Sequence, residues 1–366
     1  KGKSVADISS KVISQRIRLL FLIFVMMLSW LVLAVFAMAI AGLFVSTPSS
    51  VIPVNIEIVI AMVVGYFVYV RKKNIRFASF IALGLLYFFI WIGTIYPIEL
   101  NTENPQNTWV ILLFLYSGIA SILPVWFLLQ PRDYINSHQL IVGLALIIIG
   151  IIFTQPVIDA PMVRLELDTS APPIFPFLFI TIACGAISGF HGLVSSGTTS
   201  KQVNNFEDAR LIGYGSMLGE GTLALISTLC AVSGIALVSQ CTLPVNGLVE
   251  NLSWAVYYDS WAHASGNKAT AFVLGGGAFL MQLGIPGNIA QTLIAVLVIS
   301  FAATTLDSAT RIQRFIISEI GLATKIEILK NKYIAVFIAI IPAYMLTSLN
   351  LSTSTGQRCT FRILRG

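Results

Sequence analysis

The chain carries little charge for its length. Only 10% of its 366 residues are Asp, Glu, Lys or Arg, whereas a soluble globular domain usually carries about 25%. A water-soluble protein of this size needs a polar shell around its core. With 57% hydrophobic residues and a mean hydropathy of +0.87, the chain has too little polar material to make that shell. The composition therefore excludes an ordinary soluble domain and predicts a protein whose main partner is membrane lipid.

The sequence also lacks the patterns of a metal site and of a nucleic-acid-binding protein. The four cysteines form no CxxC pair, and the chain has no HExxH motif and no cluster of carboxylates with histidine. The net charge is +6, but Lys and Arg are gathered between apolar runs rather than along one face with aromatics between them. We therefore expect no metal, no cofactor and no nucleic-acid partner.

Long apolar runs dominate what remains. A helix needs about 20 mostly apolar residues to cross roughly 30 Å of hydrocarbon, because lipid offers no partner to free backbone groups. We therefore predict an all-α fold, a polytopic transmembrane helix bundle, in one domain over residues 1–350, followed by a basic tail over residues 351–366. The expected crossings lie near Leu19–Val45, Val51–Val70, Phe77–Tyr96, Thr108–Leu129, Gln139–Phe153, Ile174–Val194, Leu211–Val238, Asn288–Thr305 and Lys332–Leu349.

Positive charge in the short connections gives the orientation. Lys and Arg are enriched on the cytoplasmic side of membrane proteins. The connections that carry them are Lys1–Arg18, Arg71–Arg76, Arg132, Lys201–Arg210 and Arg311–Lys332. Between these, Ser46–Ser50 and Glu99–Asn107 have no Lys or Arg, and Gln155–Pro173 is mostly acidic. The alternation predicts a multi-pass protein of the bacterial inner (plasma) membrane.

The same alternation bears on two less regular parts of the chain. Only one crossing is needed between the external segment Gln240–Lys268 and the cytoplasmic Arg311. The apolar segment Ala269–Ile285, with three consecutive glycines, is therefore expected to be re-entrant or part of an external cap. The chain begins without Met at Lys1, so we expect that N-terminal helices are missing. With a cytoplasmic N-terminus in the intact protein their number is even, and two is the simplest case.

The densest polar segment at membrane depth is Ile182–Lys201, with four glycines and six hydroxyl residues. Glycine weakens a helix, and freed carbonyls and hydroxyls can coordinate a cation or a solute, as broken helices do in secondary transporters. The alternative is that small residues allow close helix packing while the hydroxyls bond their own helix. Taken as a whole, the segment favours a solute and ion site, with candidate residues Ser188, His191, Ser195, Ser196, Thr198 and Thr199. Gly118–Pro124 is a second expected break, since proline removes a helix hydrogen bond.

Ionisable residues inside the spans are candidates for proton coupling. Glu220 stands nine residues into its span, where a carboxylate needs a partner or a proton. His191 can exchange a proton near neutral pH. Glu57 lies nearer the start of a span, and we expect it at the membrane interface.

Charged residues at the predicted cytoplasmic ends are candidates for a gate. Gln130–Tyr134 reads as a charged turn, in which Arg132 and Asp133 would clamp the gate, and a simple helix-ending turn is the alternative. Asp307 and Arg311 lie four apart on one helical face, so they either pair at the interface or act in gating. The last gating candidate is Lys201.

Several long strings of the sequence carry a family resemblance. They are Leu123–Trp126 with Gln130–Tyr134, Phe175–Ile180 with Ser195–Gln202, Asp208–Gly215 with Gly219–Gly221, and Phe301–Arg311. In these strings the chain resembles the carbon starvation protein A family. Lys1–Ser4 is also similar to the family's loop after its opening helices, and the similarity extends to about Gly321.

The resemblance implies a secondary transporter, related in fold to the amino acid, polyamine and organocation superfamily. It would import peptides or pyruvate when carbon is short, with H⁺ or Na⁺ as the coupling ion, and it would not be an enzyme. The family's early glycine- and histidine-rich helix, which resembles half of a substrate site, is absent from this chain. Two other classes remain open: an intramembrane serine-type enzyme using Ser188 and His191, and a sensor or scaffold that binds a solute without moving it.

Overall fold

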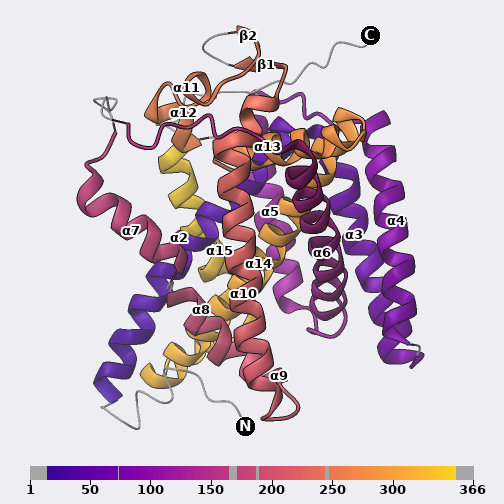
Figure 1. The fold of residues 1–366 in the computed structure, drawn as a ribbon. Helices are drawn as coiled ribbons and strands as arrows, with labels where there is room; N and C mark the ends of the chain where they lie inside the picture. The colour runs from indigo at the N-terminus through magenta and orange to yellow at the C-terminus, as the bar shows by residue number, and fades with distance from the viewer. Residues whose placement is uncertain are drawn as a thin grey trace.

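The computed structural model describes residues 15–351, except for residues 73, 165–170, 187–188, 244–246 and 267. Long helices form a bundle, and short elements gather at one end of it (Figure 1). The α-helices are α2 (Gln15–Ser46), α3 (Val51–Gly65), α4 (Ile75–Ile95), α5 (Pro105–Ile122), α6 (Leu129–Thr154), α7 (Ile174–Ala186), α8 (Gly189–Val194), α9 (Ser200–Gln202), α10 (Asp208–Leu229), α11 (Trp254–Tyr257), α12 (Trp261–Gly266), α13 (Lys268–Gln282), α14 (Gly287–Thr324) and α15 (Lys332–Leu351).

Tighter and wider helical turns extend several of these helices. The 3-10 turns are η1 (Pro48–Ser50), η5 (Ile235–Leu237) and η6 (Glu327–Lys330). The π-helical turns are η2 (Tyr66–Val70), η3 (Ser195–Thr199) and η4 (Cys230–Gly234). Two short antiparallel strands, β1 (Gln240–Leu243) and β2 (Gly247–Glu250), pair with Cys241 opposite Val249. This hairpin is the one departure from the predicted all-α fold within the described ranges.

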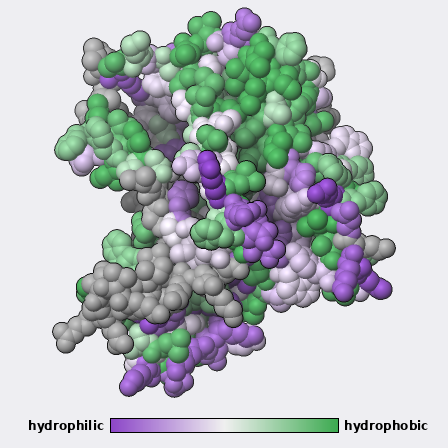
Figure 2. Space-filling model, turned by 60° about the horizontal axis from the view of Figure 1, so that its bottom comes forward, coloured by the Kyte–Doolittle hydropathy of each residue, from purple (hydrophilic) through white to green (hydrophobic). Residues whose placement is uncertain are grey.

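Six helical segments of the described chain are long and apolar enough to cross a membrane. They are Ile17–Ser46, Pro48–Val70, Ile75–Ile95, Leu129–Thr154, Asp208–Leu237 and Gly287–Thr324. Their surfaces expose large apolar side chains such as Leu20, Phe77 and Phe153, which water would not tolerate in such numbers. Figure 2 shows wide hydrophobic areas beside hydrophilic patches. The prediction of a multi-pass helical membrane bundle is therefore confirmed.

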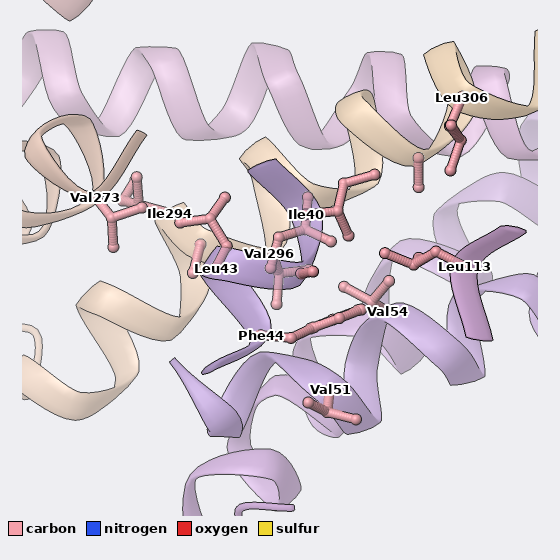
Figure 3. Close-up of a cluster of buried hydrophobic side chains, with 14 of the residues drawn as sticks. Ile40, Leu43, Phe44, Val51, Val54, Leu113, Val273, Ile294, Val296 and Leu306 are labelled. Atoms are coloured by element: carbon pink, nitrogen blue, oxygen red, sulfur yellow. The ribbon is translucent and has the colours of Figure 1, made fainter. Parts of the chain in front are cut away.

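Helix α14 forms the centre of the bundle and packs against α2, α5, α6, α13 and α15. Its apolar side chains Ile294, Val296 and Leu306 lie among those of neighbouring helices, including Ile40 and Leu43 of α2 (Figure 3). Aliphatic side chains from several helices interlock here, so removing any one of them would leave a cavity. This core fixes the positions from which polar side chains of the same helices reach one another.

The predicted crossing Asn288–Thr305 is too short. Helix α14 continues to Thr324. The sequence pattern placed the membrane boundary before Asp307 and Arg311, because charged residues usually mark an interface. Both residues are in fact buried between helices, and partners inside the bundle allow the helix to carry them past that point.

The predicted crossing Thr108–Leu129 divides at Pro124. Helix α5 ends at Ile122, and Leu123 after it has an extended backbone (φ −64, ψ 151). A residue that precedes proline is pushed out of the helical region by contact with the proline ring. The expected break at Gly118–Pro124 is therefore confirmed, although it ends a helix rather than kinking one.

The charged turn predicted at Gln130–Tyr134 is wrong. These residues form the opening turns of α6, which begins at Leu129. Pro131 is tolerated there because the first N–H groups of a helix have no partner within it. Arg132 is thereby placed inside the bundle with none of its surface exposed, and not in a cytoplasmic connection.

Helix α13 is buried among α6, α14 and η4. A Cβ on Gly275 would lie 2.1 Å from the carbonyl oxygen of Cys230, so only glycine allows this approach. With 15 residues, α13 is shorter than the roughly 20 that a crossing needs. A re-entrant segment and a part of an external cap therefore both remain predictions for it. The elements that do cover one end are β1, β2, α11 and α12, opposite α9 (Figure 1).

Candidate functional site

Three charged side chains meet in the interior of the bundle. Arg132 of α6 donates from Nε to Oε1 of Glu57 on α3 at 2.9 Å, and from Nη1 to Oδ2 of Asp307 on α14 at 3.0 Å. Glu57 and Arg132 have no exposed surface, and Asp307 is 2% exposed. Buried charges are tolerated only when they are paired and hydrogen-bonded. The arrangement therefore ties three helices together through one guanidinium.

Two hydroxyl groups complete this charge cluster. Tyr116 of α5 donates to Oδ2 of Asp307 at 2.7 Å and accepts from Nη1 of Arg132 at 2.8 Å. Ser300, two helical turns before Asp307 on α14, donates to Oε2 of Glu57. Each carboxylate thus has at least one hydroxyl donor beside the guanidinium, which is how low-dielectric sites hold charge.

Two buried polar atoms of the charge cluster have no hydrogen-bond partner among the described residues. They are Nη2 of Arg132 and Oδ1 of Asp307. A buried polar group without a partner costs about 1 to 3 kcal/mol, and more when it is charged. Native interiors leave few such atoms, and each one calls for an explanation such as a bound water or ligand.

A cavity of about 70 Å³ adjoins the charge cluster. Figure 3 shows three of its lining side chains next to one another: Phe44, Val54 and Leu113. Its full lining comes from α2, α3, α5, α6 and α14: Ile40, Phe44, Val54, Asn55, Ile58, Trp109, Leu112, Leu113, Tyr116, Arg132 and Ala303. The cavity is therefore apolar and aromatic on most sides, and the guanidinium of Arg132 lies behind this lining with no exposed surface.

Arg311 has a different partner from the one the sequence suggested. Its Nη2 donates to the carbonyl oxygens of Ala120 at 2.9 Å and Leu123 at 2.8 Å, which are left without helical partners where α5 ends. Within the part of the chain that the structure describes, Asp307 and Arg311 form no ion pair, so that alternative is wrong. Asp307 pairs with Arg132 instead.

The two predicted proton-coupling residues meet. Nε2 of His191 on α8 lies 3.4 Å from Oε1 of Glu220 on α10. Their side chains are 56% and 58% exposed, in a part of the bundle where α10 is exposed along most of its length. The structure therefore brings together two residues that lie 29 positions apart on separate segments of an apolar chain.

Several hydroxyl side chains of the polar segment donate within their own helix. Ser195 and Ser196 both donate to the carbonyl oxygen of Gly192, at 3.0 and 2.8 Å, and the backbone oxygen of Thr199 accepts from Val203. Within the described residues the helix changes from α to π at η3 without a gap, and the predicted broken helix stays a prediction. The cavity described above is not lined by this segment.

The remaining candidates are placed less fully. Ser188 lies outside the described residues, and so do the side chains of Thr198 and Lys201. Asp133 follows Arg132 in α6 and forms no ion pair with a described residue. No group of three or more His, Cys, Asp and Glu that could hold a metal ion is found in the described ranges.

Sequence reasoning missed three members of the charge cluster: Glu57, Tyr116 and Ser300. Glu57 was expected at the interface, and its burial contradicts that expectation. One signal was present, because Glu57 and Arg132 are isolated opposite charges in apolar helices, and each demands a partner. Tyr116 and Ser300 gave no such signal, since hydroxyl residues in membrane helices usually bond their own backbone.

Comparison with known proteins gives the family. The model of the carbon starvation protein CstA family matches residues 1–361. The chain belongs to the CstA family. Members similar to it include a peptide transporter CstA of Helicobacter pylori, 38% identical over 206 residues, which are 53% of this chain and 30% of that protein. The pyruvate/proton symporter BtsT of Escherichia coli is 37% identical over 215 residues, 55% of this chain and 29% of that protein.

A further CstA relative is matched over more of its length. The peptide transporter CstA of Bacillus subtilis is 31% identical over 300 residues, which are 74% of this chain and 48% of that protein. The matched region thus spans less than half the length of each of these CstA-family relatives. No solved structure matches the chain. The predicted family is confirmed, and the relatives described here are named as transporters.

Proposed function

We propose that this CstA-family protein is part of a secondary transporter that imports a small organic solute together with protons when carbon is short. Two kinds of solute follow from the relatives' names, a peptide and pyruvate, and the proton follows from the name of the Escherichia coli symporter. The family description supplies the link to carbon starvation. We place the protein in the bacterial inner membrane and expect a fold related to the amino acid, polyamine and organocation superfamily.

The contact between His191 and Glu220 carries this proposal. A carboxylate and an imidazole 3.4 Å apart can share one proton, and the proton's presence changes the attraction between their two helices. A carrier needs a titratable element whose state alters the balance between inward-open and outward-open forms. The pair supplies it, and the interrupted helix next to it supplies segments that can move.

The remaining candidate residues take roles around this pair. The polar groups of Ser188, Ser195, Ser196, Thr198 and Thr199 would replace the water that a charged or zwitterionic solute loses on entering the membrane. For Ser195 and Ser196, which donate to the carbonyl oxygen of Gly192, the exchange of that acceptor for one on the solute would cost little.

A gate would be formed by the charged residues nearer the cytoplasmic end. The proposed gate residues are Arg132, Asp133, Lys201, Asp307 and Arg311. Three of them, Arg132, Asp307 and Arg311, hold helices α5, α6 and α14 together through the bonds described above. Breaking such buried bonds is costly unless new partners replace the old ones. Opening would therefore depend on the solute or the proton.

Solute uptake into sealed vesicles tests the proposal. The full-length protein is reconstituted in proteoliposomes, and the pH and sodium gradients are imposed separately, with labelled pyruvate and a labelled dipeptide as solutes. We expect accumulation of at least one of them under an inward proton gradient. Glu220→Gln should remove the response to that gradient, while Glu207→Gln, an exposed residue just before α10, should not.

Each negative result has a distinct meaning. Accumulation of neither solute under either gradient, by folded protein, would overturn the transport function. Uptake that still followed the proton gradient in Glu220→Gln would leave transport in place and remove the role given to the His191 and Glu220 pair.

A further inference from the structure

The guanidinium of Arg314 has no anionic partner in the part of the chain that the structure describes. Arg314 lies on α14 and is 8% exposed, and none of the described ion pairs includes it. A buried charge without a partner is costly, and charges in membrane helices normally pair with one another or with backbone carbonyls. Arg314 is therefore a candidate for binding an anion that is not part of the described chain.

The guanidinium of Arg314 can be reached from outside the bundle. Its nitrogens make no hydrogen bond to a described residue, yet none of them is among the buried polar atoms that lack a partner, so each keeps some accessible surface. Its Cζ lies 4.8 Å from the centre of the Phe315 ring. Phe315 is 50% exposed on a helix long and apolar enough to cross a membrane. The guanidinium thus turns toward the exposed side of α14.

A second guanidinium lies beside the first. Arg311 precedes Arg314 by one helical turn, where Cβ atoms are about 5 to 6 Å apart, and the two like charges repel each other. Nη2 of Arg311 is held by the carbonyl oxygens that end α5, while its Nη1 has no described partner and is not fully buried. One anion that accepts hydrogen bonds from both guanidinium groups would relieve the repulsion.

The acidic residues nearest along α14 are already paired. Asp307 bonds to Arg132 at 3.0 Å, and Glu319 lies 3.9 Å from Arg18 of α2. Lys325, which follows the last turn of α14, is exposed and adds another positive charge. An anion that approaches this end of the helix therefore meets a positive field.

The position of the two arginines along α14 indicates the source of the anion. The helix has 38 residues, which makes it about 57 Å long, whereas the hydrocarbon of a bilayer is about 30 Å thick. The distribution of Lys and Arg predicts that α14 ends on the cytoplasmic side. Arg314, ten residues before that end, can therefore lie at the level of the inner head groups, where anionic lipids are found and bind basic pockets between helices.

We propose that Arg311 and Arg314 bind the phosphate of an anionic phospholipid of the inner leaflet, with an acyl chain against the ring of Phe315. This site goes beyond the proposed transport function. Arg311 also fixes the end of α5 and lies one turn from Asp307 on α14. A bound phosphate would therefore hold two helices of the proposed gate in the arrangement seen here.

Photolabelling with lipid analogues tests this site. The full-length protein is reconstituted in phosphatidylcholine vesicles with a trace of phosphatidylglycerol or phosphatidylcholine that carries a photoreactive group in its acyl chain. The labelled peptides are then identified and quantified by mass spectrometry. Arg314→Gln removes the charge and Arg314→Lys keeps it. Lys332→Gln is the matched control, because Lys332 is exposed at the same end of the bundle and lies over the ring of its neighbour Tyr333 at 5.0 Å.

We expect the phosphatidylglycerol analogue to label the part of α14 around Phe315, and the phosphatidylcholine analogue to label it much less. Arg314→Gln should lower the apparent affinity for phosphatidylglycerol roughly tenfold or more, the usual effect of losing a charge-assisted hydrogen bond. Arg314→Lys should give an intermediate affinity, and Lys332→Gln should be close to the unchanged protein.

Soluble anions separate a lipid site from a site for small anions. Inorganic phosphate or pyruvate, present on both sides of the vesicle membrane, should not reduce the labelling, because neither has an acyl chain to place against Phe315. Equal labelling by the two lipid analogues, unchanged affinity in Arg314→Gln, or displacement of the lipid by either soluble anion would overturn the proposal.

Discussion

The guanidinium of Arg132 lies 2.9 Å from the carboxylate of Glu57, and neither side chain has any exposed surface. The two residues belong to different helices, α6 and α3, and lie 75 positions apart. Together with Asp307 they form the only buried ionic contact that spans three helices of the described chain. The stability of the bundle should therefore depend on this contact far more than on any surface charge.

Arg132→Met should destabilise the protein strongly. It leaves the carboxylates of Glu57 and Asp307 buried without their cation, which typically costs about 3 to 5 kcal/mol. The free energy of unfolding in mixed micelles, measured by detergent titration, gives the effect. Arg76→Met, an exposed residue at the start of α4, should change it by less than about 1 kcal/mol. Equal effects of the two substitutions would show that the buried contact is not formed.

Asp307 should couple energetically to Arg132 and not to Arg311. Double-mutant cycles with Asp307→Asn should give a coupling of about 0.5 to 3 kcal/mol with Arg132→Gln, because the two side chains are bonded directly. The cycle with Arg311→Gln should give much less, since Arg311 donates to the carbonyls that end α5. A larger coupling energy with Arg311 than with Arg132 would show that Asp307 pairs with Arg311, as the sequence suggested.

Gly275→Ala and Gly213→Ala should have opposite effects. A Cβ at position 275 would collide with the carbonyl oxygen of Cys230, whereas one at position 213 would meet nothing within 4 Å. The first substitution should destabilise the bundle by about 1 to 3 kcal/mol. The second should stabilise α10 by about 0.5 to 1 kcal/mol, because alanine loses less entropy in a helix. The free energy of unfolding of each variant, measured by denaturant titration, tests this prediction, and a change of the same sign in both would contradict it.

Single cysteines introduced at Lys72 and Val157 should be labelled from opposite sides of the membrane. Both residues are exposed in connections between long helices, and the distribution of Lys and Arg assigns the connection after η2 to the cytoplasm. In a cysteine-free background, a membrane-impermeant maleimide should react with Val157→Cys in intact cells and with Lys72→Cys in inverted vesicles. Labelling of both from one side would contradict the orientation.

The positions of the helices could be predicted well from the sequence, but the contacts between their side chains could not. Apolar runs define α2, α3 and α4 to within a few residues, because lipid imposes a simple rule on length and composition. The same rule failed at Asp307 and Arg132, where charge was taken to mark a boundary. Charges can lie inside a bundle when they have partners there. Glu57 is 75 positions from Arg132 in the chain, and Tyr116 is 191 positions from Asp307.

The candidate site shows the same division. Glycines, hydroxyls and a histidine drew the prediction to the polar segment around η3, and a carboxylate deep in a span drew it to Glu220. That His191 and Glu220 are in contact depends on how α8 and α10 pack, and local composition holds no information about that. The cavity near Arg132 could not be predicted from the sequence either, because its lining consists mostly of ordinary apolar residues from five helices.

The π-helical turns provide a way for the side chains of His191 and Glu220 to move apart. Helix α8, which carries His191, runs directly into η3, and helix α10, which carries Glu220, runs into η4. A π turn holds one residue more than the α turn it replaces, and one residue corresponds to a rotation of about 100° around the helix axis. Rewinding either turn as α-helix would therefore swing one side chain away from the other while the helix stayed intact.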